Sequence, residues 1–294
     1  MTWTGYGLFH LAEDQGFFDD HGVDMTISVV EDESTNPAAL ESNQFQGDIT
    51  TVDTNVRTIA AGADLVQVMA IDDSNGADGI VGTADIQTVN DLAGKTVGVK
   101  VGATSYVFLL SVLKDAGMTI DDIDVVDMNP GEAGTAFVAG QVDAAVTWEP
   151  FLSKATKREG GHVVISSADA PGLIVDSLAI RRDWVDANPD ALVGLIQAYY
   201  GGRPVGDRPR HGHAGHGRDA GRVGRGIRGD HLGDQVLQPR GDRGLHERTS
   251  RPNRDPQIHD YINDFWVAED VISEPIDVES SIDGSYAQTA LNTG

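Results

Sequence analysis

Hydroxyl side chains stand where an apolar stretch of this sequence gives way to an amphipathic one. Thr104 and Ser105 head an expected helix, and Thr51 and Thr54 follow the end of an expected strand. A donor in the first turn of a helix can bind an oxyanion, because the helix dipole favours negative charge there. The alternative is an ordinary helix cap, which uses the same residue types. These four residues are candidate donors to the anionic or carbonyl group of a small solute.

Aromatic, acidic and amide side chains stand near other expected strand ends. Trp3 and Tyr6 flank Thr4 and Gly5, where a glycine permits the close approach of a ligand. The two rings could stack on that ligand or only cover the end of a sheet. An acidic side chain could pair with a cationic group or stay solvated. The candidate ligand-binding residues are Trp3, Thr4, Tyr6, Thr51, Asp53, Thr54, Asp73, Asn75, Thr104, Ser105, Trp148, Glu149 and Asp176.

Catalytic and metal-binding patterns are weak by comparison. The 294 residues include no cysteine, which excludes disulfides, cysteine-ligated metals and thiol nucleophiles. Neither a G-x-S-x-G elbow nor an H-E-x-x-H motif occurs. His211, His213 and His216 could chelate a metal, but nothing around them would fix their rings. The segment 224–229 fits G-x-G-x-x-G without a strand before it or a helix after it. We expect no catalytic residues, no cofactor and no metal.

The chain is strongly acidic. Its 46 aspartates and glutamates against 21 lysines and arginines give a net charge of −25. A field of this sign repels nucleic acid and anionic membranes. High salt would screen the self-repulsion, since the Debye length falls to about 3 Å at 1 M. The composition therefore predicts a salt-adapted, halophilic protein with no nucleic-acid partner.

Short apolar runs alternate with amphipathic stretches through the first two-thirds of the chain. One helix is expected from Thr104, as its cap, to Ala116, with Gly117 as its stop signal. Another begins at Asn188, an N-cap followed by Pro189 at the first helical position. Such alternation predicts an α/β fold. The expected strands are Met25–Val30, Leu65–Ile71, Thr96–Val101, Ile123–Met128, Ala144–Trp148 and Val163–Ser166, and further helices are expected over 132–139 and over 150–158, with Pro150 at the first position of the latter.

The segment 201–254 differs from the rest of the chain in composition. It contains 12 arginines, 5 histidines and 13 glycines, no aromatic residue, and no helical or strand period. Such a stretch cannot bury enough apolar surface to offset its ordering entropy. We expect it to be disordered, or to be the product of a shifted reading frame in which acidic codons are read as arginine codons. A helical pattern resumes at Ile258.

Six motifs occur in the order found in one family of transport proteins. The first opens at Trp3 with W-T-G-Y-G-L-F-H and closes with G-F-F-D-D-H-G-V-D at Asp24. The others are T-V-D-T at 51–54, D-S-N-G-A-D-G at 73–79, D-L-A-G-K-T-V-G at 91–98, F-V-A-G-Q-V-D-A-A-V-T-W-E-P at 137–150 and S-A-D-A-P-G-L-I-V-D at 167–176. Through these motifs the chain resembles the solute-binding proteins of the nitrate/sulfonate/taurine ABC-import family. The resemblance covers about residues 2–200 and, more weakly, 258–291.

The resemblance implies a two-lobed, periplasmic-binding-protein-like α/β fold, each lobe a mostly parallel sheet flanked by helices. Residues 1–78 and 174–294 would form a discontinuous outer lobe, and residues 79–173 an inserted lobe, with the solute in the cleft between them. The implied protein is an extracytoplasmic monomer of an ABC importer. It would deliver a small sulfonate-, taurine- or nitrate-like or amide-like solute to a membrane permease.

Two points of this resemblance stay open. The fold also carries small-metabolite enzymes of the thiamine-pyrimidine and menaquinone-pathway types, so an enzyme is the alternative function. No signal peptide or lipid-bearing cysteine precedes the first motif, so we expect the sequence to be truncated at its N-terminus.

The charges expected near the cleft bear on the solute. Two cations, Arg57 and Lys100, are expected there against several carboxylates, among them Glu149 and Asp176. A bare anion such as nitrate would meet net repulsion, whereas a solute with both an oxyanion and a cationic or N–H group could use both kinds of side chain. The alternative is that these carboxylates only solvate a salt-adapted surface.

Overall fold

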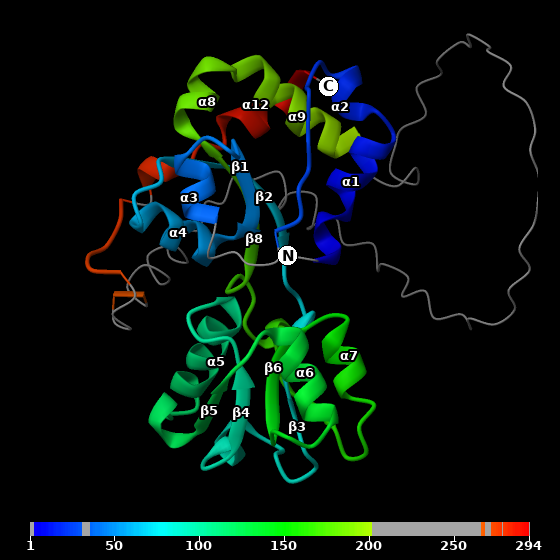
Figure 1. The fold of residues 1–294 in the computed structure, drawn as a ribbon, viewed down its shortest axis with the longest axis vertical. Helices are drawn as coiled ribbons and strands as arrows, with labels where there is room; N and C mark the ends of the chain where they lie inside the picture. Colours follow the sequence, from blue (N-terminus) through cyan, green and yellow to red (C-terminus); the bar gives the residue numbers. More distant parts are fainter. Residues whose placement is uncertain (1–2, 31–35, 202–265, 268–271, 278, 294) are drawn as a thin grey trace, which may run out of the picture.

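The computed structural model describes residues 3–30, 36–201, 266–267, 272–277 and 279–293. They form two lobes, each with its own β-sheet and its own helices (Figure 1). The two-lobed α/β fold predicted from the sequence is therefore confirmed. Apart from Gly201, the anomalous segment 201–254 lies outside the described residues, together with its three histidines and its glycine motif.

The outer lobe contains a three-stranded sheet in the order β1-β8-β2. Its strands are β1 (Gly47–Thr51), β2 (Leu65–Asp73) and β8 (Val175–Arg181). Its helices are α1 (Gly7–Asp14), α2 (Phe17–Asp20), α3 (Asn36–Glu41), α4 (Val52–Ala60), α8 (Arg182–Ala187), α9 (Pro189–Gly201) and α12 (Ser285–Thr293), with the 3-10 helices η1 (Thr4–Tyr6) and η7 (Glu279–Ser281).

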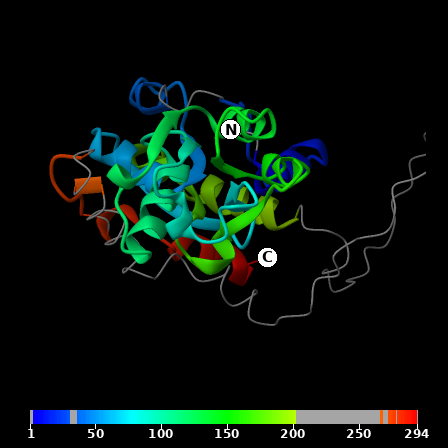
Figure 2. The same ribbon diagram turned by 90° about the horizontal axis from the view of Figure 1, so that it is seen from below.

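The inserted lobe contains a five-stranded sheet in the order β5-β4-β6-β3-β7. Its strands are β3 (Asp78–Gly82), β4 (Thr96–Val99), β5 (Asp124–Asp127), β6 (Ala144–Trp148) and β7 (His162–Ser166). Its helices are α5 (Thr104–Asp115), α6 (Pro130–Val138) and α7 (Phe151–Ala155), with the 3-10 helices η3 (Val89–Leu92), η4 (Ile120–Asp122) and η5 (Ser167–Asp169). Seen from below, this lobe lies in front of the outer lobe, so the two stack along the long axis of the molecule (Figure 2).

Strand pairing corrects the expectation of mostly parallel sheets. Among the described residues, four strand pairs are antiparallel and two are parallel. All four antiparallel pairs involve β3 or β8, the strands that carry the chain into and out of the inserted lobe, and neither was predicted. The other strands of each sheet share one direction, because a strand, a helix and a second strand in succession produce parallel strands.

The predicted strand at Met25–Val30 is also corrected. This segment is extended, but it belongs to neither of the two sheets that the described residues form. Apolar alternation was its only signal, and a strand also needs a partner for its N–H and C=O groups. The other five predicted strands are present, with ends that shift by at most two residues.

Three helix starts differ from the predictions in detail. Thr104 is the first residue of α5 and Ala103, in extended conformation, is its N-cap, while Gly117 follows the helix at a φ of 73° as predicted. The helix α9 begins at Pro189, as predicted. Pro150 lies one residue before α7, because its ψ of 6° is not helical. The helix predicted over 132–139 begins two residues earlier, at Pro130.

Apolar packing links the two lobes. One buried cluster contains Val97, Phe108 and Leu109 of the inserted lobe, and it also contains Val52 and Val56 of α4 in the outer lobe. Since α4 follows β1 directly, this packing fixes the turn between them at the junction of the lobes.

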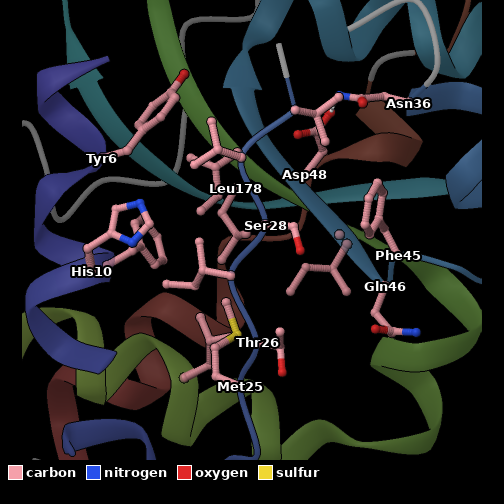
Figure 3. Close-up of a pocket in the computed structure, with 18 of the residues that line it drawn as sticks. Tyr6, His10, Met25, Thr26, Ser28, Asn36, Phe45, Gln46, Asp48 and Leu178 are labelled. Carbon is pink, nitrogen blue, oxygen red and sulfur yellow. Dashed lines mark hydrogen bonds between the residues drawn. The ribbon is translucent and has the colours of Figure 1, made fainter. Parts of the chain in front are cut away.

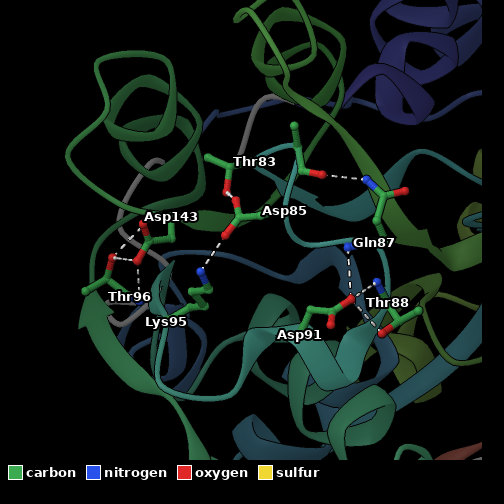
Figure 4. Close-up of polar contacts among 9 residues, drawn as sticks. Thr83, Asp85, Gln87, Thr88, Asp91, Lys95, Thr96 and Asp143 are labelled. Atoms are coloured by element: carbon green, nitrogen blue, oxygen red, sulfur yellow. Dashed lines mark hydrogen bonds and ion pairs between the residues drawn. The ribbon is translucent and has the colours of Figure 1, made fainter.

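Acidic side chains hold local structure together in the inserted lobe (Figure 4). The Asp91 carboxylate accepts hydrogen bonds from the Thr88 N–H at 2.8 Å and the Thr88 hydroxyl at 2.9 Å, in a capping box. The Asp143 carboxylate accepts hydrogen bonds from the Thr96 N–H at 2.9 Å and its hydroxyl at 2.7 Å. These hydrogen bonds lower the pKa of both aspartates. Part of the acidic composition is therefore structural.

Most of the remaining negative charge is expected to make folding dependent on salt. Raising KCl from 0.1 to 2 M should raise the midpoint of thermal unfolding by about 5 °C, because screening removes about 1–2 kcal/mol of self-repulsion. Circular dichroism would measure this. Replacing the exposed aspartates Asp24, Asp115 and Asp124 with asparagine should reduce the salt effect. A midpoint that does not change with KCl would show that the acidic composition is no salt adaptation.

Candidate functional site

Two chain segments connect the lobes side by side. The chain leaves the outer lobe after β2, enters the inserted lobe at β3, and returns through β8. The Ser74 N–H donates to the Ile174 carbonyl oxygen at 2.9 Å, which joins the outgoing segment to the returning one. Paired segments of this kind are suited to act as a hinge.

Hydroxyl groups from both lobes meet beside this hinge. The Thr51 and Thr104 Oγ1 atoms lie 2.8 Å apart, and the Thr51 hydroxyl also donates to Thr54 Oγ1 at 3.0 Å. The Thr104 hydroxyl donates to Asp53 Oδ1 at 2.9 Å. All four side chains are buried. Two positions predicted separately, the T-V-D-T motif at 51–54 and the helix start at Thr104, thus form one polar cluster. Ser105 is buried beside Thr104 in the same first turn of α5.

One cation adjoins this cluster. An Arg57 guanidinium nitrogen donates to Thr54 Oγ1 at 2.9 Å and lies 3.7 Å from Asp53 Oδ2. The guanidinium also lies over the Trp266 ring, 5.2 Å from its centroid. Asp53 Oδ2 is buried and accepts no hydrogen bond from a described residue. The carboxylate of Asp53 is therefore held by one hydrogen bond and one long ion pair.

Carboxyl groups gather on the hinge strands. Asp72 of β2 lies opposite Asp176 of β8 in the strand register. The Trp3 indole N–H donates to Asp72 Oδ2 at 3.1 Å, and the Tyr6 hydroxyl donates to Asp176. Gly5 allows this arrangement, since a side chain there would begin 2.0 Å from the Asp72 carboxylate.

Burial and mutual repulsion shift the acidity of these groups. Burial, followed by the charge of Asp72, raises the pKa of Asp176 well above its usual range. Burial also raises the pKa of Asp78 to about 6, although the Ser74 hydroxyl donates to its carboxylate. Asp72 and Asp78 were not among the predicted site residues. The only signal that could have found them is their position at strand ends beside predicted ones.

Other predicted residues lie apart from the hydroxyl cluster. Asp73 and Asn75 are exposed, and Asp73 accepts a hydrogen bond from the Gly172 N–H at 3.1 Å. The Glu149 carboxylate accepts hydrogen bonds from the Ser153 hydroxyl at 2.6 Å and the Ser153 N–H at 3.2 Å. Half-buried Trp148 pairs with Asp78 across β6 and β3, and Thr4 opens η1.

A cavity of about 610 Å³ lies elsewhere, within the outer lobe (Figure 3). Its walls come from α1, the extended segment 23–30, β1 and β8, and Trp3 and Tyr6 are its only residues from the predicted site. Asp48 on its wall accepts a hydrogen bond from the Asn36 amide at 2.7 Å, and burial raises the pKa of this aspartate. The cavity therefore does not coincide with the place where the predicted donors meet.

The described residues lack two further features. They contain no group of three or more histidine and acidic side chains placed to hold a metal ion. Within the same residues, no helix is both long enough and apolar enough to cross a membrane.

Comparison with known proteins identifies related sequences. The family model described as NMT1/THI5 like matches residues 3–203. A candidate binding protein of Brucella abortus (strain 2308) is 26% identical over 197 residues, which covers 66% of this chain and 61% of that protein. The match thus spans about three-fifths of the length of this relative. A candidate aliphatic sulfonates-binding protein of Escherichia coli (strain K12) is 37% identical over 142 residues, which covers 48% of this chain and 44% of that protein.

Solved structures share the fold. The crystal structure of the periplasmic aliphatic sulphonate binding protein SsuA from Escherichia coli matches with a TM-score of 0.70 and 19% identity, and the match covers 97% of this chain and 96% of SsuA. The desulfurization enzyme DSZB matches with a TM-score of 0.61 and 12% identity, covering 97% of this chain and 95% of the enzyme. Both binding proteins and an enzyme therefore use this fold.

Proposed function

Because the chain belongs to the NMT1/THI5-like family, we propose that it is the solute-binding component of an ABC importer for a small sulfonate-, taurine- or nitrate-like or amide-like solute. The observation that carries the proposal is the cluster of Thr51, Thr54 and Thr104, which brings donors from both lobes together beside the hinge. A solute held there would contact both lobes at once, so its binding would favour the closed arrangement.

The anionic end of the solute is assigned to the first turn of α5. Thr104 and Ser105 supply hydroxyl groups there, and the positive end of the helix dipole favours an oxyanion. The cationic or N–H end is assigned to the carboxyl pair of Asp72 and Asp176. This assignment replaces Glu149, which lies apart from the hydroxyl cluster and accepts hydrogen bonds from Ser153 within its own segment.

The names of the relatives favour a protein that binds its solute without changing it chemically. The two relatives described above, at 26% and 37% identity, carry names of binding proteins, whereas the enzyme DSZB, at 12% identity, shares only the fold. The remaining parts of the proposal follow from the same family: a monomer outside the cytoplasm that delivers its solute to a membrane permease. The enzyme alternative predicts chemical change of the solute, which mass spectrometry of the recovered solute would detect.

A ligand screen tests the proposal. Taurine, ethanesulfonate, nitrate and urea would each be added to the full chain in 2 M KCl, with thermal unfolding as the readout. Taurine is expected to raise the unfolding midpoint most, since it carries both an oxyanion and an ammonium group. Tighter binding of nitrate than of taurine would reject the two-ended solute. A lack of binding by all four, or turnover of any of them, would reject the proposed function.

Replacing Thr104 with valine is expected to weaken taurine binding about tenfold, the effect of losing one hydrogen bond to a charged group. Isothermal titration calorimetry would measure the dissociation constant. The matched control is Thr135→Val, an exposed threonine on α6 whose hydroxyl donates to the Gly131 carbonyl oxygen. Equal affinities of the two variants would remove Thr104 from the proposed site.

A further inference from the structure

Asp53 places a carboxylate of one lobe at the start of a helix in the other. It lies on α4 of the outer lobe, and its Oδ1 accepts the hydrogen bond of Thr104, the first residue of the 12-residue helix α5 in the inserted lobe. Only 2% of Asp53 is exposed. The negative group that a helix N-terminus favours is therefore already present inside the protein.

This carboxylate is incompletely compensated. Its Oδ2 accepts no hydrogen bond from a described residue, and the nearest guanidinium nitrogen of Arg57 is 3.7 Å away. That nitrogen also donates to Thr54 at the shorter distance of 2.9 Å. Because this carboxylate is buried, breaking its one hydrogen bond leaves it uncompensated until water or another donor reaches it. A group that takes the Thr104 donor must therefore outcompete Asp53.

We infer that Asp53 is an internal competitor for the anionic group of the solute. Its carboxylate uses the Thr104 donor that the proposed function assigns to an oxyanion, and in doing so it holds the lobes together while no solute is bound. An incoming anion must displace it and also meets its charge. Asp53 therefore selects against simple anions, and a solute whose ammonium group offsets the repulsion is favoured. The inference rests on the proposed function for the place of the oxyanion.

Removing only the charge of Asp53 tests the competition. Asp53→Asn keeps an oxygen that can accept the Thr104 hydrogen bond but carries no charge. Calorimetry in 0.2 M KCl should show ethanesulfonate binding about tenfold tighter to this variant than to the unmodified chain, because one repulsive charge within a few ångströms is gone. Taurine should gain less, since the lost charge also attracted its ammonium group. The control Asp186→Asn removes an exposed charge from α8 and should leave both affinities unchanged.

The contact between the lobes is tested without any solute. The chain has no cysteine, so spin labels can be placed at Asp14→Cys on α1 and Asp121→Cys in the inserted lobe. Distance measurements by pulsed electron resonance should show longer distances between the labels when Asp53→Ala is added. Adding Asp53→Asn should leave the distances as they were, because the Thr104 hydrogen bond persists.

The outcomes of these experiments distinguish the competition by Asp53, its role in holding the lobes together, and the proposed function. Equal ethanesulfonate affinities of the unmodified chain and Asp53→Asn would overturn the competition and leave the proposed function standing. Unchanged label distances in Asp53→Ala would overturn the closing role of Asp53. No binding of any solute in the screen by either protein would reject the proposed function and the competition with it, whatever the distances show. If Asp53→Asn does not fold, Asp53→Ser repeats the affinity comparison.

Discussion

Replacing Asp78 with asparagine is expected to stabilise the protein by about 3 kcal/mol at pH 7.5. Asp78 is 7% exposed, and burial is the main cause that raises its pKa from 3.8 to about 6. The charges of Asp72 and Asp53 raise it further. At pH 7.5 the folded protein must ionise this buried group, and a shift of two pKa units corresponds to about 3 kcal/mol. An asparagine of the same shape avoids that cost.

The sign of the pH dependence follows from the same shift. Folding raises the pKa of Asp78 from 3.8 to about 6. The stability that this group contributes is fully present only below pH 3.8, and it is lost as the pH rises through 6. The advantage of Asp78→Asn should therefore shrink from about 3 kcal/mol at pH 7.5 to about 1.5 kcal/mol at pH 5. The raised pKa of Asp176 acts in the same direction in the unmodified chain.

Carboxyl groups whose pKa is lowered by folding set the lower limit of the pH range in which the protein is most stable. Lys95 lowers the pKa of Asp85 to about 2, and the pKa values of Asp91 and Asp143 are lowered as well. These groups stabilise the folded protein above their unfolded pKa, and this stabilisation is lost as the pH falls below about 4. Stability of the unmodified chain should therefore be greatest near pH 4.5–5.

Urea unfolding at pH 5, 6 and 7.5 would measure the free energies. Asp115→Asn, on the exposed face of α5, is the control and should keep the pH dependence of the unmodified chain. An advantage of Asp78→Asn that does not change with pH would contradict the assignment.

Local sequence signals predicted the elements of the fold better than their connections. Gly117 and Pro189 mark helix ends through their own backbone preferences, so they were found at the right places. The strands β3 and β8 were missed because short runs such as Asp78–Gly82, with two glycines, carry little apolar periodicity. Their partners are far away in sequence, and no local pattern encodes that pairing.

The sequence predicted which types of residue form the candidate site, but not which of these residues contact each other. A hydroxyl after a strand end is a local pattern, and it identified Thr51 and Thr104. That these two hydroxyls meet each other, 2.8 Å apart, depends on how the lobes close. The burial of Asp78 and the partial burial of Asp72 depend on the hinge in the same way. Conversely, Asp73 and Glu149 have the same residue types but face solvent or a neighbouring serine, which spacing along the chain cannot distinguish.

Arg57 is the residue on which the hydroxyl cluster depends most for charge balance. It is the only cation within 4.0 Å of Asp53 among the described residues. A surface ion pair contributes little, since water solvates both ions when the pair is broken. Asp53 is different, because at 2% exposure its carboxylate cannot recover its hydration without moving the lobes.

Replacing Arg57 with methionine is therefore expected to lower the free energy of unfolding by about 3 kcal/mol at pH 7.5, since it leaves a buried carboxylate without a cation. Adding Asp53→Asn to this variant should restore about two-thirds of the loss, because the uncompensated charge is then gone. The remainder belongs to the lost packing of the guanidinium on the Trp266 ring, which no change at Asp53 can restore. Arg182→Met breaks the exposed pair with Asp64 and the hydrogen bond to the Ser280 carbonyl oxygen, and it should cost only about 1 kcal/mol. Urea unfolding of the four proteins gives the coupling energy between Arg57 and Asp53 as a double-mutant cycle. If the two substitutions add without coupling, the Asp53 carboxylate is compensated by something other than Arg57, and its place in the charge balance of the cluster must be reassigned.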